Sequence, residues 1–210
     1  TPQQFTTHHA KSAISLPRTL VTGASAGIGR EFALQLAAAG VPVLALGRNA
    51  QSLQNLQALN PLIETVEFDL ADLDLLPSLA AQWIKRYPDL ACVIHNAGVQ
   101  DNIRMDDPAY DACQLRKEVD INLVAPMVLT QALLPHFESK PHAYVVSITS
   151  GLAFAPKRTS AVYSATKAGL HLFSEALRTQ FKASTVRVIE AVMPMVDTAM
   201  TQGRGSGKIS

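Results

Sequence analysis

The sequence predicts a single α/β domain in which helices cover both faces of a doubly wound parallel sheet. Three observations support this fold class. Short apolar runs alternate with segments of helical spacing along the chain, which is the pattern of strands joined by crossover helices. The apolar run at residues 143–149 is rich in β-branched residues, as expected for a strand buried on both faces. A chain of 210 residues also has the length of one domain with a sizeable core.

The first half of the chain predicts four strands separated by three helices. The predicted strands are residues 20–21, 41–46, 65–68 and 91–95. The predicted helices are residues 28–39, 52–59 and 75–87. Each helix is followed by residues that are typical of helix ends, namely Gly40, Asn60–Pro61 and Pro88.

The second half predicts two more strands and two long helical segments. Residues 109–137 have helical spacing, and Pro126 is expected to bend this helix. A strand at residues 143–149, a helix at 162–181 and a strand at 186–192 follow. Ligands of such sheets bind beyond the carboxyl ends of the strands, so we expect the functional site at that edge.

Composition excludes several classes of function. The residues are 48% hydrophobic and 17% charged, which is typical of a globular protein. The net charge is +1 without a basic cluster, so nucleic acid is not an expected partner. The most apolar stretch, residues 32–46, is too short and too interrupted to span a membrane. Cys92 and Cys113 stand alone, which favours a reducing, cytoplasmic location.

The two ends of the chain differ from the rest in composition. Residues 1–15 are polar and include His8 and His9, so we expect a flexible N-terminal arm or a remnant of cloning. The domain is expected over residues 16–210. Residues 202–210 are rich in glycine, serine and charge, which indicates a mobile loop.

A glycine-rich segment follows the first predicted strand directly and opens the first predicted helix. It reads Thr-Gly-Ala-Ser-Ala-Gly-Ile-Gly over residues 22–29. Gly23 allows a tight exit from the strand, Gly27 lets the backbone approach a phosphate, and Gly29 lets the helix pack close to the strand. Free N–H groups at the helix start would face a pyrophosphate. An ordinary glycine-rich turn is the alternative interpretation.

Further motifs follow the glycine-rich segment in order. Asp69–Leu70 follows the third strand, Asn96-Ala97-Gly98 ends the fourth, and Tyr163 with Lys167 forms a YxxxK motif. Together with the TGxxxGxG spacing at residues 22–29, these motifs resemble the short-chain dehydrogenase/reductase family, which has a Rossmann-type fold. The resemblance covers residues 19–200, and it implies an NAD(P)-dependent oxidoreductase acting on a small carbonyl or alcohol substrate.

The resemblance also implies which residues form the site. The implied catalytic residues are Asn122, Ser150, Tyr163 and Lys167. The implied cofactor-binding residues are Gly23, Ser25, Ala26, Gly27, Ile28, Gly29, Arg48, Asn49, Asp69, Leu70, Asn96, Ala97, Gly98, Tyr163, Lys167, Pro194, Val196 and Thr198. In the family, the Ser bonds the substrate oxygen, the Asn holds a water next to the Lys, and the Lys holds the nicotinamide ribose.

Physical chemistry supports the same roles for the YxxxK pair. A free tyrosine has a pKa of about 10, and lowering it by about three units requires roughly 4 kcal/mol. Lys167 lies four residues after Tyr163, hence on the same helix face. A unit charge about 4 Å away contributes about 4 kcal/mol at an effective dielectric of about 20. Tyr163 is therefore the expected acid/base and Lys167 its electrostatic partner.

Cofactor preference should be decided at the end of the second strand, which reads Leu46-Gly47-Arg48-Asn49. No carboxylate stands there to bind a ribose 2′-hydroxyl, and Arg48 could bind a 2′-phosphate. Ala26 stands where many NADP-using relatives carry Arg or Lys. We expect NADP(H) to be preferred over NAD(H), with Arg48 as a solvated surface residue the alternative.

The chain departs from the family pattern at two places. Met195 replaces the glycine that usually follows Pro194, and this variant resembles the subgroup of DltE-type oxidoreductases. The family pattern continues with another helix and a seventh strand, which the domain at residues 16–210 is expected to lack. Either the native protein is longer, which we favour, or the sixth strand is left at an exposed edge.

Other residues with functional chemistry receive structural interpretations. His95 is expected to pack near the cofactor, and His171 to lie on a helix surface or in a subunit contact. No His, Cys or carboxylate cluster shows metal-ligand spacing, so no metal is expected. The helices at 109–137 and 162–181 commonly pair between subunits in the family, which predicts a homodimer or homotetramer.

Two other functions remain open. One is a non-catalytic dinucleotide-binding regulator on the same fold, which retention of Ser150, Tyr163 and Lys167 disfavours. The other is epimerisation through transient oxidation. Turnover of NAD(P)H with a panel of carbonyl compounds would separate an oxidoreductase from a regulator. The sequence does not identify the substrate.

Overall fold

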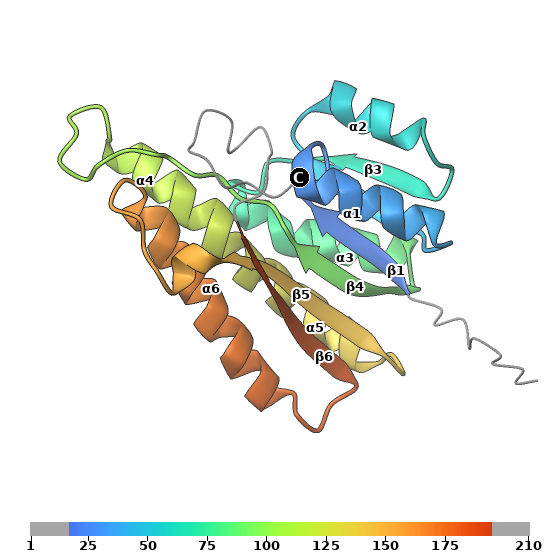
Figure 1. The fold of residues 1–210 in the computed structure, drawn as a ribbon. Coiled ribbons are helices and arrows are strands. Elements are labelled where there is room, and N and C mark those ends of the chain that lie inside the picture. Colours follow the sequence, from blue (N-terminus) through green and yellow to red (C-terminus); the bar gives the residue numbers. More distant parts are fainter. Residues whose placement is uncertain (1–16, 195–210) are drawn as a thin grey trace, which may run out of the picture.

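The strands form one six-stranded sheet in which every neighbouring pair is parallel (Figure 1). This computed structural model describes residues 17–194. The strands are β1 (Arg18–Thr22), β2 (Val43–Gly47), β3 (Ile63–Glu67), β4 (Leu90–His95), β5 (Ala143–Ser150) and β6 (Val186–Met193). Their spatial order is β3-β2-β1-β4-β5-β6. The predicted doubly wound parallel sheet is thus confirmed, and the order reverses direction between β1 and β4.

Helices lie on both faces of the sheet. They are α1 (Gly27–Ala38), α2 (Ala50–Gln57), α3 (Leu76–Arg86), α4 (Ala112–Val119), α5 (Ala125–Glu138) and α6 (Ala161–Gln180). Three short segments join them, namely η1 (Leu73–Leu75), the π-helical η2 (Asp120–Val124) and η3 (Gly151–Ala153). Among residues 17–194, no helix combines the length and apolarity needed to cross a bilayer.

Two apolar clusters, one on each face, hold the layers together. On one face, α3 and α5 pack against the sheet through side chains such as Trp83, Leu129 and Phe137. On the other face, α1 and α2 contribute Ala33, Ala37, Leu53 and Leu56. Phe137 and Leu129 are fully buried. Burying a side chain of this size contributes about 1.5–3 kcal/mol, so α5 is fixed firmly under β4 and β5.

The long helical segment predicted at residues 109–137 is three elements rather than one. Helix α4 begins at Ala112, where Asp111 accepts a hydrogen bond from the Gln114 amide at 2.8 Å and forms a capping box. The irregularity falls at Asp120–Val124, where the backbone forms a π-helix, and Pro126 stands at the start of α5. The interruption of the long helical segment therefore lies in the turn that precedes Pro126, close to the predicted bend.

Smaller differences concern strand ends. Strand β2 begins at Val43 rather than at residue 41, because Pro42 has no N–H group to donate to the ladder. Strand β3 covers Ile63–Glu67 rather than residues 65–68. The predicted arm at residues 1–15 and the predicted loop at residues 202–210 lie outside the described residues.

Candidate functional site

A cavity of about 790 Å³ opens at the carboxyl ends of the strands. Its walls come from the segments that follow β1, β2, β3, β4 and β5, together with the first turns of α6. Parallel strands place all of these segments at one edge of the sheet, and the cavity lies where the strand order reverses. The predicted site residues on its wall are Gly23, Ser25, Ala26, Gly27, Ile28, Arg48, Asp69, Leu70, Asn96, Ala97, Gly98, Ser150, Tyr163, Lys167 and Pro194.

The glycine loop has a backbone that only glycine adopts easily. Gly23 has a φ of 67° and Gly27 a φ of 54°. A Cβ atom on Gly29 would lie 2.4 Å from the carbonyl oxygen of Gly23, so a larger residue would separate α1 from β1. The N-cap residue of α1, Ala26, supplies no side-chain hydrogen bond to the first amides of the helix. These amides face the cavity end of α1, which fits an anionic group such as a pyrophosphate.

Thr22 and Asn96 fasten the ends of β1 and β4 to each other. The hydroxyl of Thr22 accepts hydrogen bonds from the amides of Asn96 and Ala97, both at 3.0 Å. The Asn96 side chain donates to the Thr22 carbonyl oxygen at 3.0 Å. Asn96 therefore acts first as a structural bridge under the glycine loop. The sequence motif contained Thr22, but its role depends on a contact 74 residues away along the chain.

At the end of β2, Arg48 and Asp69 face each other across the cavity wall. One guanidinium nitrogen of Arg48 lies 3.5 Å from a carboxylate oxygen of Asp69, and both side chains are partly exposed. The other predicted residue here, Asn49, does not line the cavity. Its side chain instead accepts a hydrogen bond from the Ser52 amide at 2.8 Å and caps α2.

Ser150, Tyr163 and Lys167 lie together on the wall formed by β5 and α6. Ser150 ends β5, and its hydroxyl oxygen accepts a hydrogen bond from the Leu152 amide at 3.2 Å. Tyr163 lies in the first turn of α6 and is 8% exposed. The Nζ atom of Lys167 lies 5.6 Å from the centre of the Tyr163 ring. The helical spacing thus brings the phenol and the ammonium to one face, as the sequence predicted.

Lys167 is buried, with 3% of its surface exposed. Its Nζ donates a hydrogen bond to the carbonyl oxygen of Ile148 in β5 at 2.8 Å. Burial lowers the pKa of Lys167 to about 8. At pH 7 the ammonium form still exceeds the neutral amine by about tenfold, so a positive charge stands beside Tyr163.

Asn122 lies inside the π-helical segment, behind the cavity wall, and is fully buried. Its Oδ1 accepts a hydrogen bond from the Val99 amide and its Nδ2 donates to the Val99 carbonyl oxygen, both at 2.8 Å. Nδ2 also donates to the Thr166 hydroxyl at 3.2 Å. The side chain therefore joins the loop after β4 to α6. π-Helical turns are frequent at functional sites because they redirect backbone groups.

The remaining predicted residues divide into two groups. Gly29, Asn49 and Asn122 are described but do not line the cavity. Val196 and Thr198, together with Met195, lie outside the described residues. Sequence reasoning missed wall residues that belong to no motif, among them Gln100, Thr149, Leu152, Ala155, Lys157 and Met193. Their signal was their position just after a strand or near its end, which the rule for ligands at strand ends could have used.

Two histidines that the sequence assigned structural roles also have defined contacts. His95 is buried, and its Nε2 lies 2.8 Å from the Thr130 hydroxyl, consistent with a packed residue. Burial, assisted by the charge of Lys167, lowers the pKa of His95 to about 3, so it is neutral. His171 lies 2.9 Å from Glu190 and close to Glu175. Sequence spacing did not indicate this group, because its members come from two elements that are separated along the chain.

Known proteins are similar to this chain in sequence. The chain matches the short chain dehydrogenase family over residues 18–208. An uncharacterized oxidoreductase of Bacillus subtilis, DltE, is 39% identical over 183 residues, which cover 87% of this chain and 73% of the relative. An uncharacterized oxidoreductase of Staphylococcus epidermidis is 30% identical over 190 residues, covering 90% of this chain and 82% of the relative.

Solved structures of the same family are also similar to this chain. A putative short-chain alcohol dehydrogenase from Sinorhizobium meliloti has a TM-score of 0.83 and 28% identity, covering 90% of this chain and 76% of its own. A short chain dehydrogenase from Burkholderia cenocepacia, solved in complex with NADP, has a TM-score of 0.80 and 26% identity, covering 92% and 78%. This chain therefore belongs to the short-chain dehydrogenase family, in a subgroup similar to DltE.

Proposed function

We propose that the protein transfers a hydride between NADP(H), or less readily NAD(H), and a carbonyl or alcohol substrate. The observation that carries this proposal is the position of Ser150, Tyr163 and Lys167 on one wall of the cavity. A phenol, a hydroxyl and a buried ammonium at one point can exchange a proton with a carbonyl oxygen and stabilise charge on it. The nicotinamide would supply the hydride.

Tyr163 is the proposed proton donor and acceptor. The ammonium of Lys167, whose Nζ lies 5.6 Å from the centre of the Tyr163 ring, favours the phenolate form of Tyr163. The positive charge of an oxidised nicotinamide would favour the phenolate further.

Ser150 and Asn122 have different proposed roles. The hydroxyl oxygen of Ser150 accepts from Leu152, which leaves the hydroxyl proton to donate to a substrate oxygen. Asn122 uses its side chain on Val99 and Thr166, so its proposed water contact beside Lys167 belongs to its backbone. The π-helical turn around Asn122 would present that backbone group.

The cavity fits a dinucleotide with a 2′-phosphate. The uncapped start of α1 would hold the pyrophosphate, and Arg48 at the end of β2 would bind the phosphate on the ribose. The Burkholderia cenocepacia structure contains NADP, which supports the same choice here. Asp69 is the competing partner of Arg48, because its carboxylate already lies 3.5 Å from the guanidinium.

We also propose a homodimer or homotetramer in which α5 and α6 of two subunits meet. Of the apolar residues along α6, Leu170 and Leu177 are buried within the subunit. Leu172, in contrast, is 66% exposed. An exposed leucine at the centre of a long helix is available to a two-fold contact. The free thiols of Cys92 and Cys113 support the proposed cytoplasmic location.

Replacing Tyr163 with phenylalanine removes the transferable proton and leaves the ring in place. We expect kcat to fall by at least about 100-fold, the lower range for general acid–base catalysis. Fluorescence titration should show unchanged NADPH binding, which separates lost chemistry from lost structure. Retention of more than about half of the activity would contradict the proposed role of Tyr163.

The burial of Lys167 predicts a pH-dependent stability. Its pKa is about 8 in the folded protein and 10.5 in a free side chain. Between these values the unfolded chain binds more protons, so the Lys167 contribution to the free energy of unfolding rises with pH. Across the whole interval between the two pKa values, this contribution changes by roughly 3 kcal/mol.

Urea denaturation of the unmutated protein and of Lys167→Met at several pH values measures this contribution. The stability of the unmutated protein relative to the variant should rise from about pH 8 to about pH 10.5. Groups that are distant from Lys167 contribute equally in both proteins and cancel in the difference. A difference that stays constant with pH would show that Lys167 is not buried in its charged form.

Arg48→Ala should remove the preference for NADPH. A charge-assisted contact is worth roughly 1.5–3 kcal/mol, so kcat/KM with NADPH should fall by about 10- to 100-fold while the value with NADH changes little. Adding Gly47→Asp should then favour NADH, although its Cβ would lie 3.0 Å from the Ser25 Cβ atom and crowd the glycine loop. Equal kcat/KM for both reduced cofactors in the unmutated protein would refute the assignment.

Light scattering at micromolar concentration tests the proposed assembly. We expect the mass of a dimer or tetramer for the unmutated protein and a smaller species for Leu172→Glu, because a carboxylate in an apolar contact is costly to bury. Leu59→Glu is a matched control, since Leu59 is 58% exposed outside the proposed contact. A clean monomer of the unmutated protein would rule this assembly out.

A further inference from the structure

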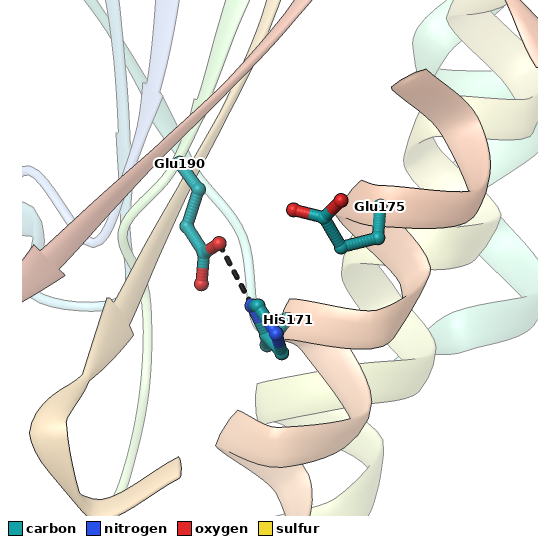
Figure 2. A group of neighbouring side chains, drawn as sticks. All are labelled: His171, Glu175 and Glu190. Atoms are coloured by element: carbon teal, nitrogen blue, oxygen red, sulfur yellow. Dashed lines mark hydrogen bonds and ion pairs between the residues drawn. The ribbon is translucent and has the colours of Figure 1, made fainter. Parts of the chain in front are cut away.

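A second cluster of ligand-type side chains lies between α6 and β6, outside the residues that line the cavity. It consists of His171, Glu175 and Glu190, and one potential ligand atom from each lies within 4.8 Å of the others. Figure 2 shows the carboxylates of Glu175 and Glu190 turned toward the space beside the His171 ring. His171 and Glu175 are one turn apart on α6, and Glu190 comes from the edge strand.

Glu190 is held in position before any ligand binds. Its side chain is 8% exposed, and one carboxylate oxygen accepts a hydrogen bond from the Thr149 hydroxyl at 2.6 Å. The other oxygen lies 2.9 Å from Nδ1 of His171. A carboxylate that a hydroxyl orients on one oxygen, with its other oxygen beside an imidazole nitrogen, resembles the support that proteins give to metal ligands.

His171 is oriented as well. Its ring lies edge-on to Phe154, with the ring centres 4.7 Å apart. The Nδ1 atom of the ring lies 2.9 Å from the Glu190 carboxylate. Glu175 is the adjustable member, since its side chain is 50% exposed and pairs with the neighbouring Arg178 on the same helix. The cluster therefore combines two side chains that are mostly covered by the protein with one exposed carboxylate.

The net charge of the cluster is negative, which favours binding of a cation. The two carboxylates carry a formal charge of −2, which the ion pair between Arg178 and Glu175 reduces to −1. Arg178 also donates to the Val188 carbonyl oxygen at 3.3 Å. A divalent ion would more than neutralise the net negative charge of the cluster. It would also replace the short contact between His171 and Glu190 with two coordinate bonds.

We propose that His171, Glu175 and Glu190 bind a divalent transition-metal ion of the zinc type. One imidazole nitrogen and two carboxylate oxygens suit zinc, whereas magnesium and calcium prefer oxygen ligands alone. Zinc holds such ligands at about 2.0–2.2 Å, so tetrahedral ligand atoms lie about 3.4 Å apart. Glu175 reaches this geometry by moving inward by roughly an ångström, which its exposed side chain allows.

The proposed ion would join α6 to β6 directly behind the cavity. Thr149, which supports Glu190, lines the cavity and precedes Ser150. On the same helix, Tyr163 lies about two turns and Lys167 about one turn before His171. The ion is therefore expected to stabilise the two elements that carry the proposed catalytic residues, without touching the reacting atoms. This assignment does not depend on the proposed reaction.

Calorimetric titration with zinc chloride tests the site, using full-length protein with His8→Ala and His9→Ala to remove the paired terminal histidines. We expect one zinc ion per chain and a higher melting temperature on binding. Glu175→Gln should weaken zinc binding by at least about tenfold, and His171→Gln should do the same. Glu31→Gln is the matched control, because Glu31 is also an exposed helical glutamate paired with a neighbouring arginine.

Three outcomes would overturn the proposal. These are the absence of a zinc-dependent change in the parent protein, equal zinc affinity in Glu175→Gln and the parent, and an equal stabilisation by magnesium. Glu175→Gln alters an exposed side chain, so the fold of this variant should be unchanged. A melting temperature equal to that of the parent protein in the absence of metal checks this. X-ray absorption of the zinc-loaded protein should show one nitrogen and two carboxylate oxygens from the chain among the zinc ligands.

Discussion

Lys167 carries its ammonium group into the interior, where it lies 2.8 Å from the carbonyl oxygen of Ile148. A buried charge disfavours the folded state unless it is well bonded, and its retention indicates a use beyond stability. The rest of the cavity wall is arranged around this charge. Tyr163 lies one turn earlier on α6, and the backbone of Gly98 approaches from the end of β4, where a Cβ atom would stand 3.7 Å from Nζ.

The parallel sheet makes this convergence achievable. Strands β1, β4 and β5 are neighbours, so the glycine loop, the Asn96-Ala97-Gly98 segment and Ser150 all leave the sheet at the same edge. Thr22 fastens the first two segments, and Asn122 fastens the second to α6. The fold therefore provides the common edge, and a few buried hydrogen bonds decide how closely the loops approach each other.

Much of this could be predicted from the sequence, because the features concerned are local. Strand–helix alternation, the glycine spacing and the YxxxK pair each depend on residues close together in the chain. The π-helical turn at Asp120–Val124 could not be predicted in this way. It accompanies the hydrogen bonds between Asn122 and Val99, which are 23 residues apart, and helix propensity does not encode such contacts. Asn49 illustrates the reverse case, since a local helix cap occupies a side chain that the family resemblance assigned to the cofactor.

Helix α6 carries residues of one regular spacing that reach two different sites. Tyr163, Lys167, His171 and Glu175 follow one another at intervals of four residues. An α-helix turns about 100° per residue, so each such interval rotates the side chain by about 40° around the axis. Over three intervals the direction changes by about 120°, from the cavity toward the edge strand. The first two residues consequently reach the cavity, whereas the last two meet Glu190 on β6. Four residues with one regular spacing are therefore separated by helix geometry into a proposed catalytic pair and two ligands of a proposed cation site.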